Sequence, residues 1–399
     1  MKKKSNLLRT YLDAWKKGEM APLFSYHLRH GLKAPLPDLL GPRDTIPSPA
    51  KEHQELQKQF SVTFSALMPV FKPKPHFLKR AVESVLAQSA PSFELLIGLD
   101  GPQPDEVIQT LQAFGDRIKL FSFEWGGISK TTNRLAERAK GGYLLLVDHD
   151  DWIAPDLLYW YHKKLKEDPQ LFLYCDEFKI DVKDRIWPHT YFKKPLTPPF
   201  PFVFFNVVTH ALLVPKTHWI GLRSEVDGAQ DFDLVLRLNK MGLKGENIPY
   251  PLYGWRIHSN STAGRLTQKV DKGLKAIQEY RPDWSFERGL VPFSYRAIPP
   301  LSTPDVYIFS KEPLSEKTFE EMSRFAMQKE IGFVTTKAEP FFFPVQRVVQ
   351  KIEPGCLMIR KELLLPEEAE ALSSFRCSPQ AIADRLSALG YLHLYTPYM

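Results

Sequence analysis

The chain has 399 residues, of which 43% are hydrophobic and 25% are charged, a composition typical of a globular protein and a length sufficient for two or three compact units. Its net charge of +7 is mild for this length, so we expect no nucleic-acid partner. The three cysteines are widely spaced and odd in number, which excludes a disulfide framework and favours a reducing, cytoplasmic setting.

The beginning of the chain forms a separate segment. Residues 1–33 carry apolar side chains at helical spacing among many lysines and arginines, and residues 34–50 are rich in proline. We therefore predict a helical N-terminal extension and a Pro-rich linker over residues 1–50. The basic helix is either a solvated helix or a peripheral contact with anionic lipids at the inner face of the cytoplasmic membrane. No apolar run typical of a signal peptide follows Leu7 and Leu8.

From residue 61 onward, apolar strands alternate with amphipathic helices. Strands are expected at Ser61–Phe71, Phe93–Leu99, Arg117–Phe123 and Tyr143–Val147, and helices at His76–Gln88, Asp105–Phe114 and Ser129–Ala139. This order predicts βαβ units and a mostly parallel sheet, the α/β class. Ligands of such sheets bind beyond the carboxyl ends of the strands, where Asp100 and Asp148 are found.

The second half of the chain is less regular. Pro199–Pro215 is its most apolar stretch, broken by Asn206, Thr209 and His210, and we predict a buried strand there, because it is too short for a membrane span. Residues 281–305 contain several prolines and are predicted to be a connector.

The strongest chemical signal is the run Asp148-His149-Asp150-Asp151, directly after the predicted strand Tyr143–Val147. If the chain stays extended there, Asp148 and Asp150 point to the same side. Two converging carboxylates favour a Mg²⁺ or Mn²⁺ ion between them, which would neutralise the diphosphate of a leaving nucleotide. The alternative is a turn that caps the next helix.

A series of motifs over residues 61–264 resembles the inverting glycosyltransferases of family 2, especially those that build bacterial surface polysaccharides. In chain order, the motifs are ALMPVFKP, AVESVLAQSAPSFELLIGLDG, GGISKTTNRLAERAKGGYLLLVDHDDWIAPDLLY, YCDEFKID, GAQDFDLVLRL and LYGWRIHSNSTA. The resemblance implies the GT-A nucleotide-sugar-binding fold, a mostly parallel mixed sheet flanked by helices, over residues 51–285. It also implies a nucleotide-sugar donor and a divalent metal, Mn²⁺ or Mg²⁺.

The resemblance assigns residues to the donor side of the site. Asp148 and Asp150 match the metal and nucleotide carboxylates of the DXD motif, and His258 matches a residue that completes the metal site. The other residues implied in nucleotide-sugar binding are Pro69, Asp100, Asn133, His149, Asp151 and Arg256. Structural alternatives stay open for several of these residues: Pro69 ends a strand, Asp100 begins an Asp-Gly turn, Asn133 lies on the surface, Arg256 is a salt-bridged core arginine and His258 is a structural histidine.

On the acceptor side, Asp231 matches the general base that takes the proton from the acceptor hydroxyl. Asp227 and Gln230 have the spacing of a capping box, so for them we predict a structural role at the start of a helix. The residues matched to the donor sugar or the acceptor are Asp176, Glu177 and Trp255. The acidic pair among them, at a predicted strand end, is also explained by simple solvation.

Residues 286–399 are predicted to form a smaller α/β module. The stretches CLMIRKELLLPEE and IADRLSALGYLHLYTPYM resemble the final elements of another transferase, but no acidic strand-end cluster lies between Pro304 and Cys356. We therefore expect a shortened, non-catalytic transferase-like module.

The resulting hypothesis is a metal-dependent inverting glycosyltransferase that moves a sugar from a nucleotide-diphosphate donor to a glycan or lipid-linked acceptor. The expected pathway is bacterial surface polysaccharide synthesis, of O-antigen, capsule or lipopolysaccharide. The alternative is a non-catalytic scaffold that binds sugar nucleotides or glycans in a polysaccharide-assembly complex. Leu99 and Gln230 favour it, because they replace acids common in the family. A nucleotidyltransferase is disfavoured, since Met68–Lys72 lacks the glycines of a phosphate-binding loop.

Overall fold

The computed structural model describes residues 63–258, apart from residue 91 and residues 187–193 and 195–205, and most of the helices and strands between residues 266 and 395. Among the described residues, a first compact unit ends at Ala276 and a second begins at Ile277. The predicted N-terminal extension, residues 1–50, lies outside the described residues. None of the described helices is long and apolar enough to cross a membrane.

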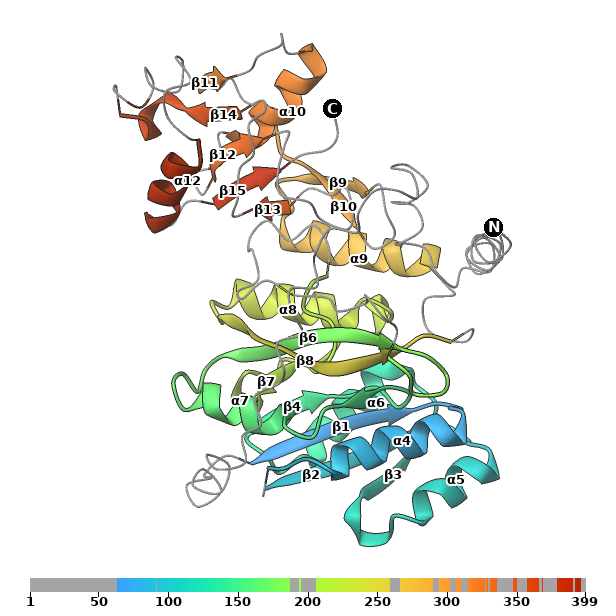
Figure 1. The fold of residues 1–399 in the computed structure, drawn as a ribbon. Helices are drawn as coiled ribbons and strands as arrows, with labels where there is room; N and C mark the ends of the chain where they lie inside the picture. The colour runs from blue at the N-terminus through green and yellow to red at the C-terminus, as the bar shows by residue number, and fades with distance from the viewer. Residues whose placement is uncertain are drawn as a thin grey trace, which may run out of the picture. The chain divides into compact units, whose positions relative to one another are not determined.

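The first unit is built around an eight-stranded mixed sheet (Figure 1). Along the chain, its strands are β1 (Phe64–Val70), β2 (Phe93–Asp100), β3 (Lys119–Phe123), β4 (Tyr143–Leu146), β5 (Trp152–Ile153), β6 (Phe172–Ile180), β7 (Leu213–Pro215) and β8 (Gly245–Arg256). In space, the order is β3-β2-β1-β4-β7-β6-β8-β5. The α/β class and the mixed GT-A sheet that the sequence implied are confirmed.

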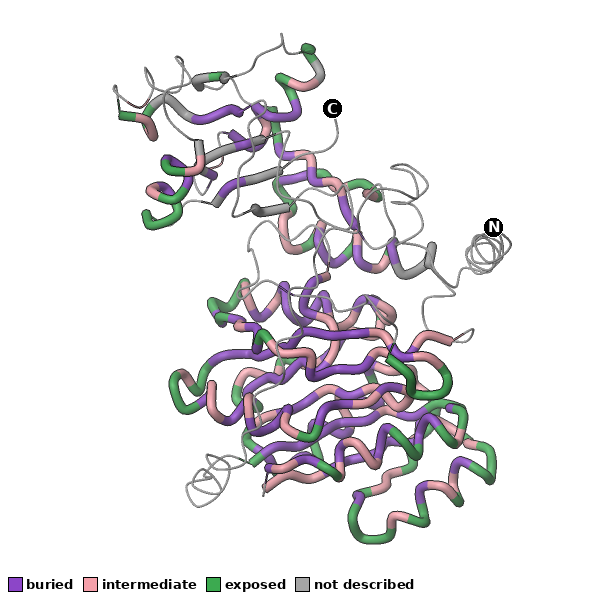
Figure 2. The backbone as a smooth tube through the Cα atoms, viewed as in Figure 1, coloured by how far each residue is buried: buried purple, intermediate pink, exposed green. Residues whose placement is uncertain are grey.

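Helices cover both faces of this sheet. They are α4 (Pro75–Leu86), α5 (Asp105–Gln112), α6 (Ile128–Arg138), α7 (Leu157–Leu165) and α8 (Gln230–Lys240). A further helix, α9 (Leu266–Tyr280), contains the boundary between the two units. Met68 of β1 packs in one core with α4, α5 and α7, whereas its neighbour Leu67 packs in another core with α6. Successive side chains of a strand point to opposite faces, so a strand buried on both faces is apolar throughout. Figure 2 shows this burial along the central strands.

The sheet brings several strand ends to one edge. β1, β2, β3 and β4 are parallel to one another. Two antiparallel steps, from β4 to β7 and from β7 to β6, return β6 and its parallel neighbour β8 to the direction of β4. The carboxyl ends of β2, β4, β6 and β8 therefore share an edge, which is where such sheets bind ligands.

Two strand predictions are wrong in the part that the structure describes. Residues 206–212, inside the predicted strand Pro199–Pro215, are in neither helix nor strand, and only Leu213–Pro215 forms β7. His210 and Ala211 have φ angles of 67° and 48°, which extended backbone does not adopt. Asp176 and Glu177 do not end a strand, because they lie inside β6, where its register against β8 shifts.

The second unit is a smaller α/β structure, as expected. Its five-stranded sheet has the order β11 (Val306–Phe309), β14 (Leu357–Arg360), β12 (Ile331–Thr335), β15 (Leu392–Tyr395) and β13 (Arg347–Val349). Its helices are α10 (Glu316–Ala326) and α12 (Pro379–Ala388), which pack in separate hydrophobic clusters. The predicted connector over residues 281–305 is wrong where it is described: β9 (Ser285–Arg288) and β10 (Tyr295–Ile298) pair there as an antiparallel ladder, with Trp284 in the core.

Candidate active site

The acidic run follows β4 at the shared edge of the sheet. β4 ends at Leu146, Asp148 lies just beyond it, and residues 149–150 form a turn, so the chain is not extended as the sequence argument assumed. The C-terminal end of this turn is held in place because the next strand, β5, pairs with β8 through Trp152 and Gly254. The fold of the acidic turn therefore depends on β8, which is distant in sequence.

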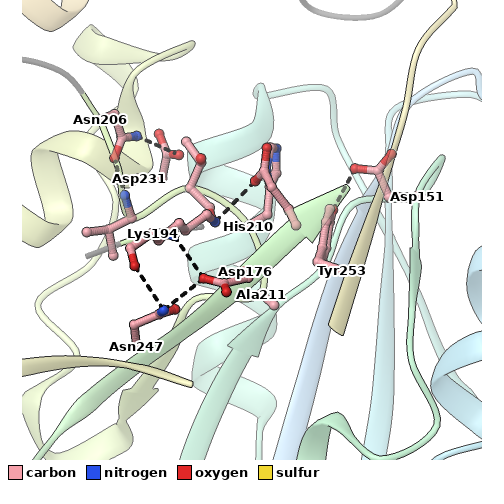
Figure 3. Close-up of polar contacts among 12 residues, drawn as sticks. Asp151, Asp176, Lys194, Asn206, His210, Ala211, Asp231, Asn247 and Tyr253 are labelled. Atoms are coloured by element: carbon pink, nitrogen blue, oxygen red, sulfur yellow. Dashed lines mark hydrogen bonds and ion pairs between the residues drawn. The ribbon is translucent and has the colours of Figure 1, made fainter. Parts of the chain in front are cut away.

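Asp151 is the structural anchor of this turn. Its side chain accepts hydrogen bonds from the Tyr253 hydroxyl at 2.6 Å and from the Arg256 backbone N–H at 2.6 Å, and the residue is 3% exposed (Figure 3). The Tyr253 hydroxyl also lies 3.3 Å from Oδ2 of Asp148. Burial, followed by the charges of Asp150 and Asp148, raises the pKa of Asp151 well above its usual value. These carboxylates are closer together than their charges favour without a cation.

Asp150 and His258 meet directly. Oδ2 of Asp150 lies 2.8 Å from Nε2 of His258, and the His258 ring packs against Phe77 with a centroid separation of 5.2 Å. Burial alone would raise the pKa of Asp150, but His258 and His149 lower it below its usual value. Nδ1 of His149 is buried and has no hydrogen-bond partner among the described residues. Two of the three predicted metal ligands, Asp150 and His258, are thus in direct contact.

Arg256 is 1% exposed, and its guanidinium contacts other groups of the protein. Nε donates to the backbone oxygen of Asp150 at 2.6 Å, Nη1 donates to that of Asp181 at 2.9 Å, and Nη2 lies 2.5 Å from Oδ1 of Asp184. The guanidinium also lies over the Phe77 ring, 4.4 Å from its centroid. Of the two interpretations that the sequence left open, this geometry favours the salt-bridged core arginine over a ligand of the diphosphate.

Glu177 is the centre of a buried ion-pair network. Its carboxylate lies 2.7 Å from Nζ of Lys179, 3.1 Å from Nζ of Lys194 and 2.7 Å from Nδ1 of His210. Burial alone would raise the pKa of Glu177, but these three neighbours hold it well below the usual value. Nζ of Lys179 in turn lies 3.2 Å from the ring centroid of Trp255. The sequence left open that Glu177 is simply solvated, and this buried ion-pair network is not consistent with that alternative.

Asp176 faces the protein interior, away from solvent. Its Oδ1 accepts hydrogen bonds from the backbone N–H of Lys194 at 2.9 Å and from Nδ2 of Asn247 at 2.8 Å (Figure 3). Asn247 also donates to the backbone oxygen of Lys194 at 3.2 Å. Asp176 therefore fixes the segment at Lys194 against β6 and β8.

Asp231 lies in the first turn of α8. Nδ2 of Asn206 donates to its Oδ2 at 3.0 Å, and the Phe232 backbone N–H donates to its Oδ1 at 2.9 Å (Figure 3). The pKa of Asp148 is raised, mainly by burial and then by the charges of Asp150 and Asp231, while His210 acts in the opposite direction. Asp231 is therefore close to the acidic turn. The general base expected from the sequence thus lies near the expected metal carboxylates.

The capping-box prediction for Asp227 and Gln230 is wrong. α8 begins at Gln230, its N-cap is Ala229, and no side chain caps it. Asp227 instead accepts a hydrogen bond from the Ser129 hydroxyl in α6, and Oε1 of Gln230 accepts from the Gly228 N–H at 2.6 Å. Ser129 pairs across the fold and does not cap its own helix, whose N-cap is Gly127.

The remaining donor-side residues lie around the same edge. Asp100 ends β2 and accepts hydrogen bonds from the backbone N–H groups of Gly126 at 2.7 Å and Gly127 at 3.0 Å. Asn133 holds Leu222 through both ends of its amide, at 2.8 Å each. Pro69 lies inside β1, beyond the last residue that pairs with β4, so its missing N–H breaks no hydrogen bond to that strand.

His210 is a site residue that the sequence did not predict. It comes from the loop before β7, and one of its ring nitrogens lies within 4.8 Å of carboxylate oxygens of Asp148 and Asp151, a set that fits a divalent cation. The sequence held one signal, a histidine that interrupts an apolar stretch. That signal does not say which way the side chain points.

Comparisons with known proteins show what the chain is similar to. Residues 65–226 match the family model described as glycosyl transferase family 2. The chain is 30% identical over 264 residues to an uncharacterised protein of Sinorhizobium fredii, an alignment that covers 61% of this chain and 29% of that protein. It is 24% identical over 285 residues to the hyaluronan synthase of Pasteurella multocida, covering 67% of this chain and 28% of the synthase.

The chain spans less than a third of the length of either relative. Among solved structures, it is similar to residues 1–349 of S. aureus TarS in complex with UDP-GlcNAc, with a TM-score of 0.45 and 16% identity over 55% of this chain and 66% of that chain. The match of the family model spans β1 to β7 and includes the acidic turn. This chain therefore carries a glycosyltransferase domain of family 2.

Proposed function

We propose that this protein is a metal-dependent inverting glycosyltransferase, which moves a sugar from a nucleotide-diphosphate donor to a glycan acceptor in bacterial surface polysaccharide synthesis. The observation that carries the proposal is the direct contact of Asp150 with His258 at the sheet edge, near Asp148, whose pKa is raised by burial and by the charges of Asp150 and Asp231. Similarity to a hyaluronan synthase supports a polysaccharide product. The proposed acceptor is a glycan or a lipid-linked glycan.

The proposed metal ligands are Asp148, Asp150 and His258. Oxygen and imidazole ligands suit Mn²⁺ or Mg²⁺, and a bound ion would neutralise the charge of the departing nucleoside diphosphate. His258 is braced by Phe77, and its Nε2 already faces Asp150 at 2.8 Å. The protein therefore holds this imidazole where it can serve as a ligand beside the carboxylate.

Asp231 is the proposed general base. In a single displacement, the acceptor oxygen bonds to the anomeric carbon, the bond from that carbon to the diphosphate oxygen breaks, and the acceptor proton passes to Asp231. Asn206 and the Phe232 N–H hold the carboxylate by hydrogen bonds of 3.0 and 2.9 Å. Asp231 lies in the first turn of α8, at the positive end of the helix dipole.

Several donor-side residues are proposed to act through the backbone that they hold. Asp100 fixes Gly126 and Gly127 at the start of α6, and Asn133 fixes Leu222, so both shape the donor pocket indirectly. Asp151 and Arg256 position the acidic turn. Pro69 and His149 remain proposed direct neighbours of the nucleotide.

Trp255 is the proposed contact with the donor sugar or the acceptor. Its indole is half-buried, with Nζ of Lys179 3.2 Å from its ring centroid and the centroid of the His210 ring 4.7 Å away. An aromatic face is a common platform for the apolar side of a sugar ring. Asp176 and Glu177 are buried, so we propose that they position this part of the site without touching the sugar.

The second unit and the N-terminal segment have proposed roles outside catalysis. The second unit, a shortened transferase-like module in our interpretation, would position the acceptor or a partner. The basic N-terminal residues, proposed to rest on the inner face of the cytoplasmic membrane, lie outside the described residues.

The test is release of nucleoside diphosphate from a panel of UDP-, GDP- and dTDP-sugars with Mn²⁺ or Mg²⁺. We expect release by the wild type and by Asp116→Ala, a control at an exposed acid, and no release with a chelator or in Asp150→Ala. Donor binding by calorimetry without release, even after addition of polysaccharide acceptors, would favour the non-catalytic scaffold instead.

A further inference from the structure

His210 lies in the loop before β7, in a position that the proposed function has not used. We propose that His210 is a further imidazole ligand of the divalent cation, in a set that it shares with Asp148 and Asp151, and that Glu177 positions its ring. This proposal rests on the metal-dependent transfer proposed above. It adds a residue from the loop at 206–212 to a site otherwise built from the ends of β4 and β8.

The three side chains already form a compact donor set. One carboxylate oxygen from each aspartate and one ring nitrogen of His210 all lie within 4.8 Å of one another. A cation with bonds of about 2.1 Å spans ligand atoms up to about 4.2 Å apart, so small side-chain movements close this set around an ion. Two carboxylates and one neutral imidazole also make a donor set that matches Mn²⁺ in charge and softness.

Glu177 gives His210 the arrangement of a metal-binding imidazole. Nδ1 of His210 lies 2.7 Å from Oε2 of Glu177, a carboxylate with 4% of its side chain exposed. Lys179 and Lys194 keep this carboxylate ionised, since their ammonium groups lie 2.7 and 3.1 Å from it. With its proton on Nδ1 donated to Glu177, the ring leaves the lone pair of Nε2 free for a cation. Metal-bound histidines commonly donate their other nitrogen to a carboxylate in this way.

Tyr253 connects the imidazole to the two aspartates. Its ring stacks on His210 at a centroid separation of 4.8 Å and an interplanar angle of 11°. Its hydroxyl donates to Asp151 at 2.6 Å and lies 3.3 Å from Asp148. One residue of β8 therefore sets the position of all three proposed ligands, which limits the reorganisation needed when an ion binds.

The backbone supports the same interpretation. His210 and Ala211 both have positive φ angles, 67° and 48°, although neither is glycine. Such conformations cost free energy and persist where the surroundings fix them, frequently at functional sites. The conformation turns His210 toward Glu177 and Tyr253 while its neighbour Ala211 is fully buried.

A different role for the same contacts is an imidazolium ion that bridges Glu177 and Asp148 without binding metal. The test that separates the two is pulsed EPR of Mn²⁺ bound to the full chain, with UDP, GDP or dTDP in separate samples and with ¹⁵N-labelled histidine. Only an imidazole bonded to Mn²⁺ gives strong nitrogen coupling. The variants are His210→Ala, His258→Ala, the double variant, and His218→Ala as a control that is partly exposed and pairs with Thr217.

We expect histidine coupling to persist in His258→Ala, to disappear in the double variant, and to be unaffected by His218→Ala. Bound Mn²⁺ whose coupling is the same in wild type and His210→Ala overturns this proposal and leaves the proposed function intact. Absence of bound Mn²⁺ in every sample overturns both. If circular dichroism shows that His210→Ala does not fold, His149→Ala/His258→Ala decides: coupling that survives there supports His210, and loss of coupling rejects it.

Discussion

Replacing Arg256 by lysine tests whether this guanidinium supports the acidic turn. Its three nitrogens reach the Asp150 backbone oxygen at 2.6 Å, the Asp181 backbone oxygen at 2.9 Å and Oδ1 of Asp184 at 2.5 Å. A lysine ammonium keeps the charge but cannot reach three acceptors spread around a planar fork. The variant loses two charge-assisted hydrogen bonds, each worth about 1.5–3 kcal/mol, and new contacts of the ammonium group with water and protein recover part of this free energy. We therefore expect the free energy of unfolding to fall by about 3 kcal/mol.

The measurement is thermal unfolding followed by circular dichroism. For a domain of this size, about 3 kcal/mol lowers Tm by roughly 6–12 °C. The matched control is Arg117→Lys, at an exposed arginine, for which we expect an unchanged Tm. The reasoning is refuted if Arg256→Lys unfolds at the wild-type temperature and instead loses nucleoside diphosphate affinity, because the guanidinium would then reach the ligand.

Three further predictions concern the base, its support and a buried histidine. Asp231→Asn should lower the rate of sugar transfer by about 10²–10⁴-fold with donor binding by calorimetry unchanged, and a wild-type rate would exclude it as the base. Asn206→Ala should lower the same rate about fivefold, since Asp231 loses a hydrogen bond worth about 1 kcal/mol; an unchanged rate would show that this contact does not position the base. Burial, with a smaller effect of Lys166, lowers the pKa of His162 from 6.5 to about 4. Between about pH 6.5 and about pH 4, His162 is therefore protonated in the unfolded chain and neutral in the folded chain. The free energy of unfolding falls as the pH falls through this range, by up to about 2 kcal/mol at pH 5. His162→Leu should remove this loss, and urea denaturation at pH 7 and pH 5 checks it: equal pH dependence in both proteins would contradict the assignment.

The strands β1 to β4 and the acids at the ends of β2 and β4 could be predicted from the sequence because their signals are local. Continuous apolar runs mark strands buried on both faces, and an acid after such a run must lie at a strand end. Asp100 and Asp148 are found there. The β9–β10 pair was missed because its two short strands lie in a proline-rich stretch, a composition that is typical of a connector.

The direction in which a polar side chain points could not be predicted. Three polar residues near the predicted site form hydrogen bonds with backbone groups of the protein: Asp100, Asn133 and Arg256. Those partners are distant in sequence, so no local pattern reveals them. His210 is the opposite case, because two positive φ angles in an apolar stretch turn a histidine toward Asp148.

The most direct test of the central claim, a single displacement at this acidic edge, is the anomeric configuration of the sugar that the enzyme first releases. Proton NMR follows the hydrolysis of an α-linked nucleotide-sugar donor identified by the release assay, faster than the free sugar mutarotates. The account predicts that the β anomer appears first and that Asp231→Asn abolishes its formation. Initial release of the α anomer, or an undiminished rate in Asp231→Asn, would contradict it.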